Sequence, residues 1–230
     1  MKDKIAELIQ DNNISTSLLS DVLDTLDIKG ILPHMVTRLS GGKKIIGQAY
    51  TVQWMDNRKG KSITHKQPST WEQVRDFLVP NLGIGDGKGK VYVAGAGNLL
   101  THSALAGGIS ATYFQKHLEF EGIVLGGAVR DSEVITDLSI PVFATNFVPR
   151  DTQGAYHISS VGDYCVVDDQ VIFTNDWVIA DSDGVIIIPE KRIEEVLKLS
   201  LEIRSKEARV INDVIANQKL PEIIDKYGTI

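Results

Sequence analysis

The 230-residue sequence contains a single cysteine, Cys165. One thiol excludes an intrachain disulfide and a zinc site built on several cysteines. Its place in the strand-like stretch "DYCVVDD" predicts a buried, unreactive side chain. The five histidines are scattered, without the close pairing typical of a histidine metal site. A reducing compartment therefore fits this sequence, and we expect a cytoplasmic protein.

Long apolar runs and excess positive charge are missing as well. No apolar stretch reaches membrane-spanning length, and the charged segment "MKDKIAELIQDNN" lacks the apolar centre of a signal peptide. The net charge of −6 disfavours a nucleic-acid-binding surface. The nearest basic cluster, "NRKGK" (57–61), is short and predicts a solvated loop. We expect neither a membrane nor a nucleic acid as partner.

The composition that remains is that of an ordinary globular protein, with 43% hydrophobic and 23% charged residues. A chain of this length suits one large domain. We expect a single domain over residues 1–230, divided into N-terminal helices (1–30), an α/β core (31–190) and a C-terminal helix with a tail (191–230).

Helical spacing predicts helices at both ends of the sequence. Residues 3–11 form the first, and 14–30 the second, with Ser15 or Thr16 capping its start and Gly30 its end. Residues 191–217 predict one long amphipathic helix, continuous or broken, that packs on a partner subunit or on its own sheet.

The middle of the sequence alternates between strand and helix patterns. Strands are predicted at 44–54, 90–98, 122–127 and 140–146, and a loop at 60–70. Helices are predicted at 71–79, at 101–118 with an interruption near its start at Gly107 and Gly108, and at 131–138. Four short strands follow, "YCVV", "QVIF", "WVIA" and "GVIIIP". Wholly apolar strands such as "GIVLGG" are typical of sheets covered on both faces. The pattern therefore predicts a layered α/β fold.

Two strand-to-helix junctions carry candidate ligand-binding residues. In "VAGAGNLLTHSALAGGIS" (93–110), glycines allow close backbone approach, and free N–H groups at a helix start attract anions. In "GGAVRD" (126–131), Arg130 could clamp a carboxylate. Asp131 could hold a hard cation such as Mg²⁺, or simply cap the next helix beside a surface ion pair. Ligands of layered α/β proteins gather at the carboxyl ends of strands, where both junctions lie.

Other motifs predict no chemistry of their own. "GAG" (95–97) is not a dinucleotide-binding fingerprint, because Leu100 fills the position of the last glycine. "DSDG" (181–184) predicts a turn rather than a calcium loop. His102 and Ser103 lack the surroundings of a catalytic nucleophile, so a structural or binding role is favoured.

An ordered set of stretches covers nearly the whole chain: "SLLSDVLDTLDIKGIL", "KKIIGQAYTV", "KVYVAGAGN", "ALAGGISA", "GIVLGGAVRDSEVI", "IPVFATN" and "WVIADSDGVIIIPEKRIEEVL". Through them the chain resembles the RraA-like family, which includes the 4-hydroxy-4-methyl-2-oxoglutarate/4-carboxy-4-hydroxy-2-oxoadipate aldolases. The resemblance implies a three-layer β/β/α swivelling sandwich. It also implies a homotrimer or homohexamer with active sites between subunits.

The same resemblance implies a mechanism. A divalent cation, Mg²⁺ or Mn²⁺, binds a small 2-oxo acid, and cleavage of a carbon–carbon bond leaves pyruvate enolate. Arg130 matches the catalytic arginine that contacts the substrate, and Asp131 matches the catalytic aspartate that anchors the metal. The substrate-binding loop that holds the pyruvyl carboxylate matches Gly107, Gly108, Ile109 and Ser110.

Two departures from the aldolases concern acidic residues. An acid upstream of the Arg-Asp pair is replaced here by Gly108 or Ile109, and an aspartate two residues before Ala128 by Gly126. Glu133 and Asp137 are local candidates to replace these acids, although both are expected to face solvent.

The sequence is compatible with three functions. The first is a metal-dependent lyase that cleaves a small 2-oxo acid or decarboxylates an oxaloacetate-like one. The second is a non-catalytic regulator that binds a ribonuclease, as relatives that inhibit RNase E do, although those resemble this chain less at Asp131. The third is a divergent enzyme with another substrate.

Overall fold

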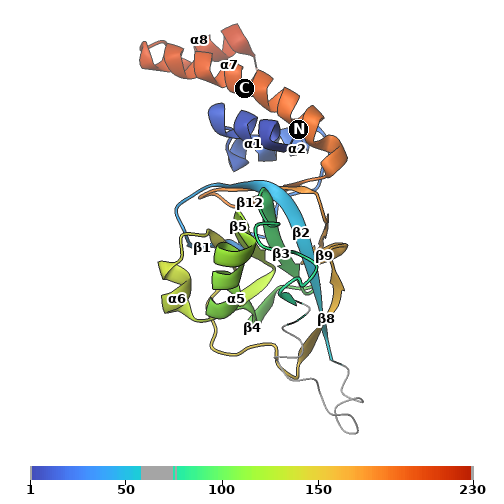
Figure 1. Ribbon diagram of the computed structural model, residues 1–230. Helices are drawn as coiled ribbons and strands as arrows, with labels where there is room; N and C mark the ends of the chain where they lie inside the picture. Colours follow the sequence, from blue (N-terminus) through green and yellow to red (C-terminus); the bar gives the residue numbers. More distant parts are fainter. Residues whose placement is uncertain (1, 58–74, 76, 229–230) are drawn as a thin grey trace.

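The computed structural model describes residues 2–57, 75 and 77–228 (Figure 1). The loop predicted at 60–70 and most of the helix predicted at 71–79 lie outside the described residues. Phe77 and Leu78, at the end of that predicted helix, are half-buried and pack against the core.

The elements follow one another in this order: α1 (Lys2–Asp11), α2 (Thr16–Thr25), β1 (Thr37–Ser40), β2 (Ile45–Asp56), β3 (Lys90–Gly95), β4 (Leu100–Ala106), α5 (Gly108–Tyr113), the π-helix η1 (Phe114–Leu118), β5 (Gly122–Leu125), β6 (Gly127–Val129), α6 (Ser132–Asp137), β7 (Val142–Ala144), β8 (Tyr156–Val161), β9 (Tyr164–Val167), β10 (Gln170–Phe173), β11 (Trp177–Ala180), β12 (Val185–Ile188), the 3₁₀ turn η2 (Glu190–Arg192), α7 (Ile193–Ile215) and α8 (Leu220–Tyr227).

A mixed sheet forms the centre of the molecule, with strand order β1-β7-β5-β3-β2-β11-β12 and β8 paired with β2. Strands β2, β3, β5 and β7 run parallel to one another, and the remaining pairs are antiparallel. Two short ribbons lie outside this sheet, the antiparallel pair β9–β10 and the parallel pair β4–β6. The β4–β6 pair positions the candidate site.

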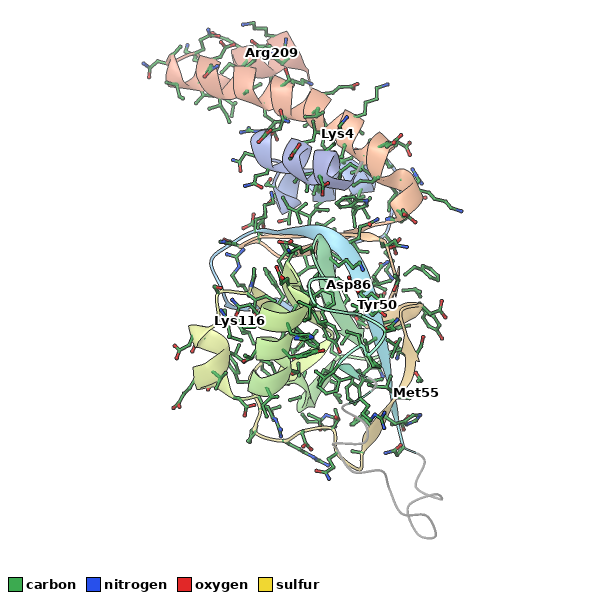
Figure 2. All side chains as sticks on the ribbon, in the orientation of Figure 1. Lys4, Tyr50, Met55, Asp86, Lys116 and Arg209 are labelled. Atoms are coloured by element: carbon green, nitrogen blue, oxygen red, sulfur yellow. The ribbon has the colours of Figure 1, made fainter. Side chains whose placement is uncertain are left out.

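Alternation along β2 explains the layers. Tyr50 and Val52 point into a core shared with Phe114 under α5 and η1, whereas Ala49 points into a second core with Cys165 of β9. Successive side chains of a strand face opposite sides of the sheet, so both faces are covered. Figure 2 shows Tyr50 among these packed side chains, with Lys4 and Arg209 at the helical end. The predicted α/β sandwich is confirmed.

Helices α1, α2 and α7 share a third apolar cluster over β11 and β12. Figure 1 shows α7 running across α1 and α2 and then away from the sheet. The predicted long C-terminal helix is confirmed, and α7 is continuous. It packs on the N-terminal helices of the same chain. The tail contains a second helix, α8. The division of residues 1–230 into one domain with these bounds stays a prediction.

The boundaries of α2 confirm one capping prediction and correct another. Ser15 caps the start, since its hydroxyl accepts the N–H of Leu18 at 3.2 Å. The helix ends at Thr25, five residues before Gly30, and Asp27 takes the left-handed conformation (φ 52°). Gly30 instead allows close approach to β12, because a Cβ there would collide with the carbonyl oxygen of Ile187.

The helix predicted over 101–118 is wrong in its first third. Residues 100–106 form β4, and the helix begins only at Gly108. The leucines and alanines of this stretch fit either pattern, and partners elsewhere decide between them. Ala104 donates its N–H to the carbonyl of Arg150 at 2.8 Å, and β4 pairs with β6. Non-local pairing has overridden local propensity here.

Among the described residues, the model contains no helix whose length and hydrophobicity would let it cross a membrane. The predicted inert thiol is confirmed: Cys165 is buried, and burial raises the pKa of its thiol far above the ordinary value.

Candidate functional site

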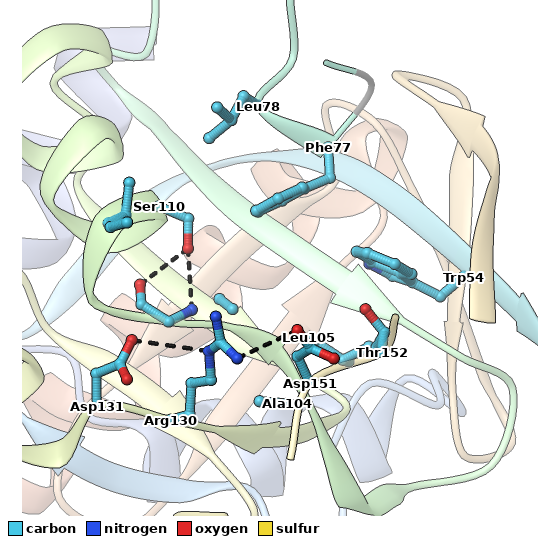
Figure 3. A pocket seen from close by; sticks show the side chains of 13 residues that line it. Trp54, Phe77, Leu78, Ala104, Leu105, Ser110, Arg130, Asp131, Asp151 and Thr152 are labelled. Carbon is cyan, nitrogen blue, oxygen red and sulfur yellow. Dashed lines mark hydrogen bonds and ion pairs between the residues drawn. The ribbon is translucent and has the colours of Figure 1, made fainter. Parts of the chain in front are cut away.

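The two junctions predicted from the sequence meet at the ends of β4 and β6. The N–H of Arg130 donates to the carbonyl of Ala106 at 3.1 Å, which ties the end of one strand to the end of the other. The parallel pairing brings the loop at Gly107 and Gly108 beside Arg130 and Asp131. All of these residues except Gly108 line one cavity (Figure 3).

Asp131 does not cap the helix that follows it. The residue precedes α6 in the left-handed conformation (φ 63°), and its side chain makes no capping bond to that helix. Its Oδ2 accepts the N–H of Gly108 at 2.8 Å, so the carboxylate lies at the start of α5 instead. The side chain is 44% exposed, and Oδ1 has no hydrogen-bond partner among the described residues. This oxygen is available to a ligand.

The start of α5 is held by its own polar groups. The hydroxyl of Ser110 accepts the N–H of Gly107 at 3.0 Å and donates to the carbonyl of the same residue at 2.9 Å. The first helical bond runs from Ala111 to Gly107, so the N–H groups of Ile109 and Ser110 have no acceptor in the described part of the chain. These are the N–H groups expected to receive an anion.

Gly107 is required where it stands. A Cβ at this position would lie 2.7 Å from Oδ2 of Asp131 and 3.0 Å from Cγ of Arg130. The absence of a side chain lets both functional groups approach the loop backbone.

Arg130 lies between two carboxylates. Its Nη1 donates to Oδ2 of Asp151 at 3.2 Å, and its Nε lies 3.8 Å from Oδ2 of Asp131. Asp151 is held in turn by the N–H of Gln153 at 2.9 Å. The remaining nitrogen, Nη2, has no partner among the described residues and is free for a substrate oxygen.

Asp151 is the charged site residue that the sequence did not predict, and the lining residues Trp54, Phe77 and Leu78 were not predicted as part of the site either. Asp151 lies in the loop after β7, twenty positions beyond Asp131, and a main-chain bridge to Ala104 brings it to the site. The available signal was its place in "PRD" (149–151), polar residues just after the predicted strand at 140–146.

The cavity itself is small, about 120 Å³, and its charged residues lie together on one side (Figure 3). Arg130, Asp131 and Asp151 lie on that side. Trp54, Phe77 and Leu78 form the facing wall, with the rings of Trp54 and Phe77 centred 5.8 Å apart (Figure 3). The site therefore combines a charged half with an apolar half.

A side chain could not be added at Gly126 or Gly108 without rearrangement, whereas Ile109, the other position matched to a missing acid, already carries an exposed side chain. A Cβ at Gly126 would lie 2.9 Å from Cγ2 of Val167, and one at Gly108 would lie 2.9 Å from Cβ of Val134. Each contact is shorter than real Cβ atoms tolerate. Glu133 and Asp137 are exposed on α6 and lie outside the cavity lining, so the expectation that they face solvent is confirmed.

The other sequence motifs, His102-Ser103 and "DSDG", lie outside the candidate site. His102 lies 3.2 Å from the hydroxyl of Tyr156, and Ser103 is buried; neither lines the cavity. The "DSDG" turn is confirmed, since the N–H of Asp181 donates to the carbonyl of Gly184 at 3.1 Å.

A metal at this site would have few protein ligands. Among the described residues, no three histidine, cysteine, aspartate or glutamate side chains gather into a cluster that could hold an ion. Mg²⁺ usually keeps several waters and needs only one or two carboxylates, so the free Oδ1 of Asp131 fits such an ion. A zinc site with four protein ligands does not fit.

The family model called RraA-like (Aldolase/RraA) matches residues 16–187. The chain belongs to the RraA-like family. DlpA from Legionella pneumophila is 30% identical to this RraA-like chain over 217 residues, which are 94% of this chain but 32% of DlpA. The uncharacterized protein MJ0644 of Methanocaldococcus jannaschii is 26% identical over 192 residues, 81% of each protein.

An RraA-like relative from Burkholderia mallei, provisionally named 4-hydroxy-4-methyl-2-oxoglutarate aldolase, is 36% identical over 112 residues. The match covers 47% of this chain and 64% of that protein. The chain thus spans about a third of DlpA and just under two thirds of the Burkholderia protein.

Solved structures support the RraA-like fold. An uncharacterized protein from Pseudomonas syringae pv. tomato superposes with a TM-score of 0.77 at 19% identity, covering 96% of each chain. Streptomyces coelicolor RraAS2, described as an unusual member of the RNase ES inhibitor RraA family, superposes with a TM-score of 0.70 at 22% identity. That match covers 89% of this chain and 95% of RraAS2.

Proposed function

We propose that the protein is a divalent-metal-dependent carbon–carbon lyase that converts a small 2-oxo acid to pyruvate. The observation that carries this proposal is the convergence of Arg130 and Asp131 on one cavity, each with an atom left unpaired among the described residues. A structural cap or a surface ion pair would not need a cavity. The aldolase name of the Burkholderia relative supports the reaction class.

Asp131 is the residue that would hold Mg²⁺ or Mn²⁺. When bound, the cation supplies positive charge beside the keto oxygen, where negative charge develops as the carbon–carbon bond breaks. The hydrogen bond from Gly108 fixes Oδ2 and leaves Oδ1 without a hydrogen-bond partner among the described residues. The lack of side chains at Gly107 and Gly108 keeps the loop backbone close to the carboxylate.

Arg130 and the start of α5 would bind the carboxylate of the 2-oxo acid. The free Nη2 of Arg130 and the N–H groups of Ile109 and Ser110 are suitable donors for an anion. Asp151 holds the other end of the guanidinium, so Arg130 is oriented before substrate enters. A substrate held this way presents its C3–C4 bond to the same cavity, for retro-aldol cleavage or for decarboxylation of an oxaloacetate-like acid.

The assembly and location belong to the same proposal. A homotrimer or homohexamer, with the site completed between subunits, and a cytoplasmic location follow from the family resemblance. A regulator that binds a ribonuclease is the competing function, since RraAS2 shares the fold. The intact pair of Arg130 and Asp131 in a formed cavity favours the lyase.

Pyruvate release tests the proposal directly. Wild type and variants are assayed with Mg²⁺ or Mn²⁺ on oxaloacetate and on a panel of 4-hydroxy-2-oxo acids. The variants are Asp131→Ala and the control Asp137→Ala, because the carboxylate of Asp137 is exposed on α6. We expect Asp131→Ala to lower kcat/KM at least about 100-fold and to lose Mn²⁺ binding measured by electron paramagnetic resonance. Asp137→Ala should change neither.

Equal rates for wild type and Asp131→Ala would remove Asp131 from the mechanism. No turnover across the panel with metal present, together with co-purification of a ribonuclease, would replace the lyase by the regulator.

A further inference from the structure

We propose that the substrate is a 4-hydroxy-2-oxo monocarboxylic acid whose C4 carries an alkyl or aryl group. This proposal rests on the proposed function and adds the chemistry of the half of the substrate that leaves. The observation that supports this proposal is the division of the cavity into one charged side and one apolar wall.

The apolar wall is part of the folded core. Trp54, near the end of β2, is buried, and Phe77 packs against both Trp54 and Phe114, the latter with ring centroids 6.2 Å apart in an edge-on contact. Leu78 lies beside Phe77 on the same wall, and Leu105 lines the cavity from β4. The wall is fixed by packing, so a ligand meets it ready-formed.

The described residues of one subunit provide charge for one substrate carboxylate. Among the described lining residues the only cation is Arg130, which already faces Asp131 and Asp151. A substrate carboxylate at Arg130 uses this cation. A second carboxylate, at the far end of the substrate, would lie against Trp54 and Phe77 without a cationic partner among the described residues.

The mouth of the cavity continues the apolar wall. Ile109 lines the cavity and is 71% exposed, beside the start of α5 that would hold the first carboxylate. The remaining polar lining groups, Ser110 and Thr152, are uncharged hydroxyls. The hydroxyl of Thr152 suits the C4 hydroxyl of the substrate, whereas that of Ser110 is already bonded to Gly107. Neither hydroxyl provides positive charge for a distal anion.

The reaction needs no further reactant. The C4 hydroxyl loses its proton, the bond between C3 and C4 breaks, and its electron pair passes to the pyruvate enolate, which takes a proton at C3. The other product is an apolar aldehyde, or a ketone when C4 carries two carbon groups. The apolar wall would stabilise this product's side chain in the cleaved state as in the substrate.

A matched pair of substrates tests the inference on the wild-type protein. 4-Hydroxy-2-oxoheptanoate and 4-hydroxy-2-oxoheptanedioate have the same carbon chain and differ only in a terminal methyl or carboxylate. We expect kcat/KM for the monocarboxylate to be at least about tenfold higher. An equal value, or a preference for the dicarboxylate, would overturn the inference.

Placing a cation on the wall should shift this preference. Leu78→Arg is expected to reduce the ratio of the two kcat/KM values at least about fivefold, because the new guanidinium pairs with the distal carboxylate. Ile84→Arg is the matched control, since Ile84 is 75% exposed and outside the cavity. It should leave the ratio unchanged. Equal shifts in both variants would contradict the inference.

A second readout separates this inference from the proposed function. Exchange of the methyl protons of pyruvate with deuterated water, followed by nuclear magnetic resonance, depends only on the charged side of the site. Exchange without preference for the monocarboxylate would overturn the inference alone, whereas absence of both exchange and cleavage would overturn the proposed function with it. Leu78→Arg could also lose proton exchange and sediment as a smaller assembly than wild type. That result would show that the apolar wall is a contact between subunits and would overturn the inference.

Discussion

Two aspartates of this protein have nearly the same neighbours and very different states. Asp131 accepts the N–H of Gly108 at the start of α5 and lies beside Arg130. Asp181 accepts the N–H of Thr16 at the start of α2, at 2.9 Å, and lies 3.9 Å from Nζ of Lys44. Each is a carboxylate at a helix start with a cation close by, the arrangement that the helix dipole favours.

The difference lies in how many bonds each carboxylate makes. Both oxygens of Asp181 are used, because Oδ1 accepts the hydroxyl of Thr16 and the N–H of Asp183, and its side chain is only 20% exposed. Asp131 uses one oxygen and is 44% exposed. A carboxylate with both oxygens bonded fixes the structure, whereas one with a free oxygen beside a cavity can bind a ligand.

The pKa of Asp181 reflects this bonding. Burial alone would raise the pKa of Asp181, but the hydrogen bonds from Thr16 and Asp183 and the charge of Lys44 outweigh burial and hold it below the ordinary value. Burial lowers the pKa of Lys44, and Asp181 partly offsets this. The group as a whole is a partly buried connection between α2 and the β11–β12 turn.

The largest expected effect comes from Asp131→Asn. The amide oxygen can still accept the N–H of Gly108, so folding is preserved while the negative charge that would hold a cation is removed. We expect kcat/KM to fall at least about 100-fold, or about 2.7 kcal/mol in transition-state stabilisation, with the free energy of unfolding changed by less than about 1 kcal/mol. Kinetics and urea unfolding measure the two quantities. A large fall in the free energy of unfolding of Asp131→Asn would show that Asp131 has a structural role like that of Asp181.

Asp181→Ala should show the opposite behaviour. Removing a helix-capping carboxylate leaves the N–H of Thr16 without its acceptor and Lys44 without its ion pair, although the Lys44 ammonium keeps its bond to the carbonyl of Ile14. We therefore expect the free energy of unfolding in urea to fall by about 1–3 kcal/mol. The rate of pyruvate release should change less than twofold. Asp183→Ala is the control, because its bond to Ser17 is exposed and should contribute less than about 0.5 kcal/mol. Similar effects of the two variants would contradict a capping role for Asp181.

Asp151→Asn should produce a smaller, purely binding effect. Arg130 would lose its ion pair and its fixed orientation while keeping the rest of the site. Because carboxylate binding is equal in the ground state and the transition state, we expect KM to rise about 3–10-fold with kcat within about twofold. A fall in kcat without a change in KM would show that Asp151 takes part in the chemistry rather than positioning Arg130.

The smallest expected effect is in the pH dependence of stability. The folded pKa of Asp181 lies below that of the unfolded chain, about 3.9, so its contribution is complete above that pH and is lost as pH falls through the folded pKa. The difference in unfolding free energy between wild type and Asp181→Asn should therefore be constant from pH 5 to 7 and narrow below about pH 4. Urea unfolding across this range measures it, and a difference that widens in acid would contradict the pKa shift.

The sequence predicted the elements whose residues carry local signals. Ser15 as a cap, the strand alternation of residues 44–54 and the short strands from 164 onward needed only neighbours in the chain, and all are confirmed. Residues 100–106 form a strand because of partners in β6 and at Arg150, far away in sequence. Gly30 was misjudged for the same reason, since its contact is with Ile187 of β12.

The site residues likewise divide into those with local sequence signals and those placed by contacts distant in sequence. The sequence brings Arg130 and Asp131 together by adjacency, and the family resemblance matched the loop at Gly107 that meets them. It gave no means of predicting that Asp131 would bond to Gly108 rather than cap α6, because that choice depends on the φ of 63° imposed by the strand end. Asp151 was missed because only the main-chain bridge to Ala104 brings it there.

The packing of Val167 against Gly126 has a consequence for redesign of the site. An aspartate at 126 would place its Cβ 2.9 Å from a valine methyl of β9, and overpacking of this kind costs about 1–3 kcal/mol. An acid at 126 therefore requires a second substitution, a smaller residue at 167, so that two linked changes are needed where the sequence alone suggests one.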